Sequence, residues 1–134
     1  MKKHTVDKGV ESTRVDYKLK LEGEKPRSWL KSVSAFANTQ GGDIYFGYTN
    51  DTHKAVGLDN TQKTASKISE LIETRISPNV RYEIIETESD LENRHCLDLK
   101  ILSGPNYPYY YVHDRAREVY VRHGDRSTLQ RKLN

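Results

Sequence analysis

The stretch Trp29–Gly47, WLKSVSAFANTQGGDIYFG, decides the fold of this 134-residue chain. Its apolar residues first recur at helical spacing, and after Gly41 and Gly42 they alternate as in a β-strand, at Ile44 and Phe46. Either glycine can adopt the left-handed conformation that closes a helix, and neither has a side chain to hinder close approach. The pattern predicts a helix that ends at the glycines and leads into a strand. A structural role and a ligand-contacting loop explain the glycines equally well.

The residues on either side of this stretch predict a second helix and further strands. From Arg14 to Glu22, polar and apolar residues alternate, which predicts a half-buried first strand. After the central strand, an apolar stripe favours a helix that is capped by Asn60 or Thr61 and ends before Pro78. The remaining predicted elements are a short strand at 55–58, a hairpin of strands at 80–86 and 95–102, and later strands at 109–112 and 118–122.

These elements add up to an α+β fold, with two main helices packed on a mixed, largely antiparallel sheet of about six strands. The length suits one domain. We expect a flexible basic arm at 1–12, the domain at 13–128 and a basic tail at 129–134.

The composition indicates a soluble chain with a small core. Hydrophobic residues make up 34% and charged residues 31%. The sequence contains no run of about 18 apolar residues, the length that a membrane-spanning helix needs. No hydrophobic segment follows the N-terminal lysines, so we expect a cytoplasmic protein without a membrane partner. The single cysteine, Cys96, excludes an internal disulfide and suits a small core position.

Charge is distributed unevenly along the chain. Residues 1–35 hold nine Lys and Arg against five Asp and Glu, 36–100 hold seven against eleven, and 101–134 hold six against three. The two ends are therefore basic and the middle is acidic. If the ends meet in the fold, they form a positive face suited to phosphates, and otherwise they are ordinary solvated surface.

Several classes of chemistry are disfavoured by missing motifs. The chain has no GxxxxGK[ST] loop, so we expect no ATP binding. Its five histidines and one cysteine lack the paired spacing of a zinc site. No nucleophile motif singles out a Ser/His/Asp or Cys/His triad.

Three carboxylates are candidate ligands for a divalent cation. Glu11, Asp16 and Asp51 offer the oxygen ligands that Mg²⁺ or Mn²⁺ prefers when substrate phosphates complete the coordination shell. Residues five apart do not share a face of a strand or helix, so Glu11 and Asp16 converge only if the chain bends between them. The alternative is that all three are surface charges.

Basic and aromatic residues in the C-terminal third suggest a binding surface. Arginines pair with phosphate oxygens, and tyrosines can stack on unpaired bases. The alternative for the tyrosines is the sheet core, above all for Tyr120. Arg122 falls on the face opposite Val119 and Val121, so we expect it at the surface. The basic residues concerned are Arg115, Arg117, Arg122, Arg126 and Arg131, and the neighbouring aromatic ones are Tyr107, Tyr109, Tyr110, Tyr111 and Tyr120.

Four segments in order resemble the Schlafen-type AlbA domain family. They are ESTRVDYK (11–18), AFANTQGGDIYFG (35–47), Val56-Gly57 and VYVRHGDRST (119–128), and together they span nearly the whole chain. The second segment is the most specific. The resemblance implies an α+β fold and a nucleic-acid partner, in a family known for DNA-binding modules of bacterial regulators and for the core of Schlafen proteins.

The resemblance also raises the possibility of catalysis. Some Schlafen proteins cleave tRNA or rRNA with three acidic residues and a divalent cation, and the first two acids correspond to Glu11 and Asp16. The third belongs just after the FG strand, where Thr49 and Asn50 stand and only Asp51 is acidic. That departure puts nuclease activity in doubt.

Three hypotheses follow. The first is a module that binds DNA or RNA mainly through phosphates, for example as the N-terminal part of a transcriptional regulator. It would need no cofactor and would use Lys18, Lys20, Arg115, Arg117, Arg122 and Arg126. The second is a Mg²⁺- or Mn²⁺-dependent ribonuclease with Glu11, Asp16 and Asp51 as metal ligands and catalytic residues. The third is a protein-interaction or homodimerisation module that uses an unpaired sheet edge or a tyrosine patch.

Overall fold

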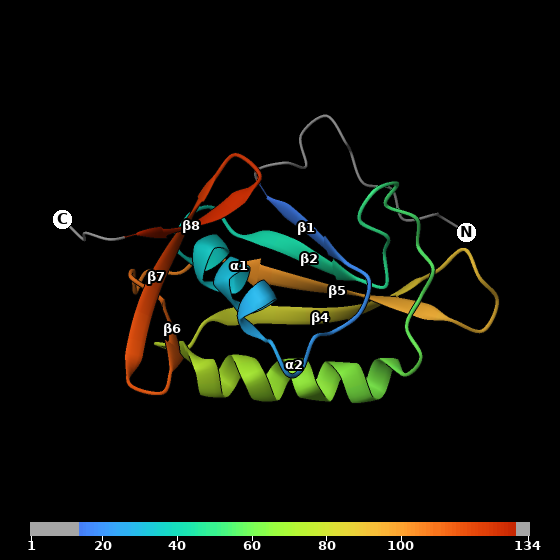
Figure 1. Cartoon of the computed structure of the whole chain (residues 1–134), viewed down its shortest axis with the longest axis horizontal. Coiled ribbons are helices and arrows are strands. Elements are labelled where there is room, and N and C mark those ends of the chain that lie inside the picture. The colour runs from blue at the N-terminus through green and yellow to red at the C-terminus, as the bar shows by residue number, and fades with distance from the viewer. Residues whose placement is uncertain (1–13, 131–134) are drawn as a thin grey trace.

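The computed structural model describes residues 14–130, which form two helices and two four-stranded sheets. The α+β class is as expected, but eight strands in two sheets replace a single sheet of about six (Figure 1). In chain order the elements are β1 (Val15–Lys18), α1 (Arg27–Ala37), β2 (Gly42–Phe46), α2 (Thr61–Arg75), β3 (Ile76–Ser77), β4 (Arg81–Glu88), β5 (His95–Leu102), β6 (Tyr110–His113), β7 (Ala116–His123) and β8 (Arg126–Gln130).

The first sheet has the strand order β1-β2-β5-β4. β1 pairs with β2 in parallel, and the other pairs are antiparallel. Its inner face carries Ile44, Phe46 and Leu99, which belong to the core. Its opposite face carries a cross-strand row of Tyr17, Tyr45 and Asp98, because these residues are partners in the register.

The second sheet has the strand order β3-β6-β7-β8 and is antiparallel throughout. Helix α1 lies against one of its faces, where Tyr111 and Tyr120 join the same core. Figure 1 shows α1 between the two sheets. The two sheets therefore share one core through this helix.

The glycine pair ends α1 as expected, and its structural role is visible. Gly41 has a φ of +78° and donates its N–H to the Phe36 carbonyl at 2.8 Å, which closes the helix. A Cβ on Gly42 would lie 2.6 Å from the Phe36 ring and 2.7 Å from the Arg14 carbonyl. Backbone conformation at Gly41 and close packing at Gly42 therefore account for the two glycines.

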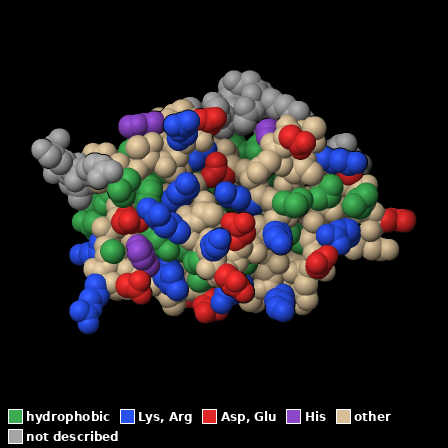
Figure 2. Space-filling view, in the orientation of Figure 1, with side chains coloured by type: hydrophobic (Ala, Val, Ile, Leu, Met, Phe, Trp, Pro, Cys, Tyr) green, Lys and Arg blue, Asp and Glu red, His purple; other side chains and the backbone are tan. Residues whose placement is uncertain are grey.

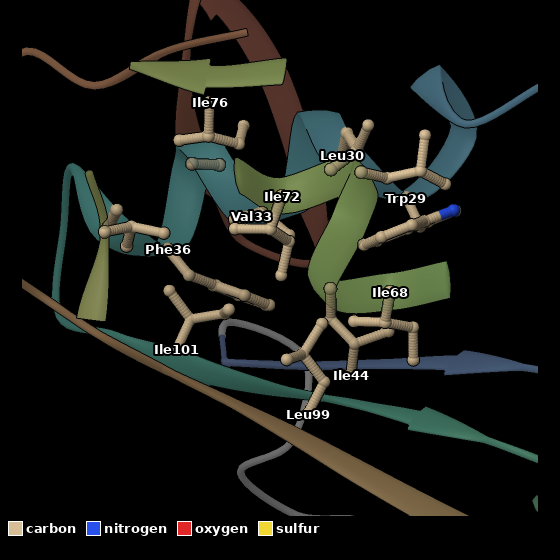
Figure 3. Close-up of a cluster of buried hydrophobic side chains, with 14 of the residues drawn as sticks. Trp29, Leu30, Val33, Phe36, Ile44, Ile68, Ile72, Ile76, Leu99 and Ile101 are labelled. Atoms are coloured by element: carbon tan, nitrogen blue, oxygen red, sulfur yellow. The ribbon is translucent and has the colours of Figure 1, made fainter. Parts of the chain in front are cut away.

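The core is built from both helices and the inner face of the first sheet. In Figure 3, Phe36 of α1 points towards the strands, and Ile68 and Ile72 of α2 approach Ile44 and Leu99. All of these side chains are buried. Trp29, also buried, meets the Phe46 ring edge-on at 5.7 Å between ring centroids.

Most predicted elements are confirmed, with local differences. Helix α2 and its Asn60 cap, which accepts the Lys63 N–H at 2.9 Å, are as expected, and so is the β4–β5 hairpin. The first strand ends at Lys18, and residues 55–58 make only isolated bridges. Strands β3 and β8 were not predicted. Within residues 14–130, no helix is long and apolar enough to span a membrane.

Candidate nucleic-acid interface

Asp16 and Arg122, which belong to different sheets, form a largely buried ion pair. The guanidinium donates from Nη2 to Asp16 Oδ1 at 2.8 Å and to the Val15 carbonyl at 3.1 Å. The Arg122 side chain is only 4% exposed and lies over the Phe36 ring, 4.7 Å from its centroid. The expected surface position of Arg122 is therefore wrong, because the ring and the carboxylate hold it on the inner face.

The other Asp16 oxygen accepts a hydrogen bond from Ser32 of α1. Ser32 is also 3.0 Å from the Ser127 hydroxyl, which accepts from Arg122 Nη1 at 2.9 Å. The Asp16 carboxylate, 19% exposed, is thus engaged through both oxygens. Asp16 therefore stabilises the contact between β1, α1 and the β7–β8 hairpin.

A cavity of about 290 Å³ lies beside this ion pair. Asp16, Lys18 and Asn50 line it, and sequence analysis did not single out the other two polar lining residues, His53 and Asp125. His53 has a φ of +55° and stacks on Tyr17 at 3.7 Å between ring centroids. A histidine with positive φ cannot be recognised from sequence, whereas Asp125 lies within the segment 119–128 that carries the resemblance.

The structure does not bring the three proposed metal ligands together. Asp51 does not line the cavity, and its exposed carboxylate accepts the N–H of Thr52 at 2.7 Å. Glu11 lies outside the described residues. Within 14–130, no three His, Cys, Asp or Glu side chains are arranged to hold a metal ion.

The six basic residues predicted to bind nucleic acid lie in different places. Lys18 donates to the Ser28 carbonyl at 3.3 Å. Lys20 lies on a groove of about 760 Å³ beside α2, where Lys63, Lys67, Glu24 and Glu70 mix both charges. Figure 2 shows the same mixture of Lys, Arg, Asp and Glu over this side of the molecule. Lys18 shares its cavity with Asp16 and Asp125, so neither lysine belongs to a surface of one sign.

Apart from Arg122, the predicted arginines lie on or beside one surface, which is the side of the second sheet that faces away from α1. We call this surface the outer face. Arg117 and Arg126 occupy strand positions on it, and Arg115 lies in the β6–β7 turn. All three are exposed. By register, the outer face comprises Ser77, Tyr110, Val112, Arg117, Val119, Val121, His123, Arg126, Thr128 and Gln130.

The strand positions of the outer face hold no acidic residue within the described chain. The nearest acids in sequence, Asp114 and Asp125, lie in the turns, and Glu118 is on the inner face. There Glu118 accepts from the Tyr120 hydroxyl at 2.8 Å and pairs with Arg27 at 3.2 Å. The outer face therefore presents positive charge beside apolar side chains.

The face of the first sheet that carries Tyr17 and Tyr45 mixes charges of both signs. Asp98, 6% exposed, lies beside Asp43, and burial together with this neighbour raises the pKa of Asp98 to about 8. Lys100 donates to Asp43 at 3.0 Å, and that bond raises the pKa of Lys100. Glu83 faces Lys100 across the strands. This face therefore pairs acids with bases, whereas the strand positions of the outer face carry arginines without an acid.

Comparisons with known proteins agree with this architecture. The family model described as Schlafen, AlbA_2 matches residues 11–130. The N-terminal domain of an ATP-dependent DNA helicase RecG-related protein from Nitrosomonas europaea, solved by solution NMR, superposes with a TM-score of 0.62 at 20% identity. The match covers 92% of this chain and 86% of that domain. A comparison with curated proteins gave no match.

Proposed function

The chain belongs to the Schlafen AlbA_2 family, and from this premise we propose that it binds nucleic acid through phosphate contacts on the outer face of its second sheet. Its family associates it with nucleic acid, and the similar solved domain comes from a protein named for a DNA helicase. The observation that carries the proposal is the pair of exposed arginines, Arg117 and Arg126, at strand positions that hold no acid.

Phosphate contacts supply most of the sequence-independent affinity for nucleic acid, and they release counterions. Arginine suits this task because its planar guanidinium stays charged and binds phosphate oxygens in pairs. Arg115 in the adjoining turn extends the same surface. Such a module needs no cofactor to bind, and a transcriptional regulator is one protein in which it would serve.

Fluorescence anisotropy with a labelled oligonucleotide across a salt series tests the proposal. We expect log affinity to fall linearly with log salt concentration, by about 0.7 to 0.9 per phosphate neutralised. The double variant Arg117→Ala/Arg126→Ala should lower the magnitude of this slope by roughly 1.4 to 1.8, because it loses two phosphate contacts. Arg81→Ala, which removes an exposed arginine from β4 of the other sheet, is the matched control. Equal slopes for all three proteins would refute this surface.

Metal-dependent RNA cleavage stays a prediction drawn from the resemblance. In its favour, Asn50 lies on the same cavity as Asp16 and offers an amide oxygen there. Incubation of tRNA with Mn²⁺ or with a chelator, for wild type, Asp16→Ala and Asp51→Ala, tests it. Metal-dependent cleavage by wild type and Asp51→Ala, but not by an Asp16→Ala protein that circular dichroism shows to be folded, would identify the cavity as the active site. Intact tRNA in every sample would exclude this activity.

A further inference from the structure

The outer face contains a stacked pair of planar groups. The Arg117 guanidinium lies over the Tyr110 ring, with its Cζ 4.1 Å from the ring centroid. The two residues come from neighbouring strands, and the register places Val112 opposite Arg117 and Val119 opposite Tyr110. Stacking fixes the plane of a long side chain that would otherwise sample many rotamers. The pair is thus a preformed flat surface on a rigid sheet.

The surroundings of this pair are apolar rather than purely cationic. Val112 and Val121 are half-buried on the same face, the one turned away from α1. Tyr107, in the loop that leads into β6, is 48% exposed. A surface that contacted only phosphates would gain nothing from these apolar groups, because phosphate oxygens are charged, whereas bases offer apolar contacts.

We propose that the outer face binds single-stranded nucleic acid, with a base stacked on the Arg117–Tyr110 pair and the backbone phosphates held by Arg126 and Arg115. This inference rests on the proposed function and narrows its substrate class. Bases of a single strand expose their π faces to aromatic rings and guanidinium planes, whereas a duplex hides them inside its stack. Duplex therefore satisfies the arginines of this face but not its planar and apolar groups.

The dimensions of the face suit a short strand. His123 of β7 is the register partner of Arg126 and lies six residues after Arg117. This separation corresponds to roughly 20 Å along the strand. A single strand that lies along β7 can place one base on the stacked pair and its following phosphates near Arg126. A chain of 15 nucleotides is long enough to cover this distance with either polarity.

The experiment measures the affinities of the whole chain for fluorescein-labelled dT15, for rU15 and for a 15-base-pair duplex at one fixed salt concentration. The informative variant is Tyr110→Ser, and Tyr110→Phe, which keeps the ring, is its matched control. Circular dichroism and thermal unfolding verify that both variants are folded. We expect dT15 or rU15 to bind more tightly than the duplex. Because stacking of one base contributes about 1 to 3 kcal/mol, Tyr110→Ser should weaken single-strand binding about 5- to 150-fold, while Tyr110→Phe stays within twofold.

Each outcome separates this inference from the proposed function. If single strand and duplex bind equally and Tyr110→Ser changes neither, phosphate binding stands and the stacking inference is wrong. If no probe binds, both fail. If Tyr110→Ser is unfolded, a second measurement decides between the outcomes: the amide chemical-shift changes that dT15 causes in the wild-type protein. Changes concentrated at Val112, Val121 and Thr128 support the inference, and changes confined to the other sheet overturn it.

Discussion

At the scale of single residues, Asn38 has the clearest structural role. Its side chain accepts the Tyr109 N–H at 2.7 Å and donates to the Tyr109 carbonyl at 3.0 Å and to the Tyr120 carbonyl at 2.9 Å. One amide thus satisfies backbone groups at the start of β6 and in β7, where the two strands no longer pair. Ser34, one turn earlier, bonds the same two residues. These hydrogen bonds explain the asparagine at position 38 without any ligand.

Replacing Asn38 by aspartate should therefore destabilise the fold. Asn38→Asp removes the hydrogen bonds donated to the two carbonyls and places a carboxylate against their oxygens. We expect a loss of about 3 kcal/mol in the free energy of unfolding. Urea denaturation measures it. Asn106→Asp, which makes the same chemical change in an exposed loop, should stay within about 0.5 kcal/mol of wild type. Equal stability of the two variants would contradict this role.

Asp98 gives a second residue-scale prediction, which concerns pH. Because burial beside Asp43 raises its pKa to about 8 in the fold from 3.8, the folded state keeps a proton that the unfolded chain releases near pH 4. The contribution of Asp98 to the free energy of unfolding therefore falls as pH rises from about 4 to 8 and levels off above that range. An asparagine side chain in its place would donate to Asp43 as the protonated acid does, without losing a proton.

We expect Asp98→Asn to be more stable than wild type at pH 8, by up to about 5 kcal/mol if the whole shift is expressed, and close to it at pH 4. Urea unfolding at both pH values measures the difference between the two proteins. Glu88→Gln, which neutralises an exposed acid on β4, should show no such dependence. A variant that is less stable at pH 8 than at pH 4, relative to wild type, would show that the carboxylate is needed in its charged form.

At the scale of elements, the sequence patterns correctly predicted those features that depend on only a few neighbouring residues. The helical spacing from Trp29 onward, the glycine pair and the Asn60 cap each act over a few residues, and the structure has all three. Strand β3 could not be foreseen, because it is two residues long and forms only by pairing with β6. Strand β8 is polar and exposed at alternate positions, so its sequence is equally compatible with a tail.

The junction between α1 and β2 allows a test at this scale. Gly42→Ala would place a Cβ 2.6 Å from the Phe36 ring and 2.7 Å from the Arg14 carbonyl, so the helix and the strand must move apart. We expect a loss of about 2 kcal/mol, measured by urea denaturation. Gly23→Ala is the control, since its Cβ would meet only Lys67 at 3.8 Å. A neutral Gly42→Ala would mean that the junction is looser than the structure shows.

At the scale of the whole molecule, the sequence could not reveal that its strands divide between two sheets. Alternation shows that a strand has one buried face, but it does not show which strand is its partner. The same limit affected the candidate site. Alternation correctly placed Arg122 opposite Val119, yet only the packing of α1 on Tyr120 decides which of these faces is inside. The metal-ligand hypothesis likewise depended on where a turn directs Asp51.

The Asp16–Arg122 ion pair joins the two sheets, and a double-mutant cycle measures its contribution. Arg122→Met keeps an unbranched stem over Phe36 but leaves the partly buried carboxylate without this cation, which should cost about 3 kcal/mol. Asp16→Asn should cost somewhat less. The double variant should lose less than the sum, with a coupling of about 1 to 2 kcal/mol, because the second substitution removes a charge that the first left unpaired. The same Arg122→Met protein should keep the wild-type salt slope for nucleic acid, since its guanidinium faces the interior. A lower slope together with additive stabilities would place Arg122 at the nucleic acid instead.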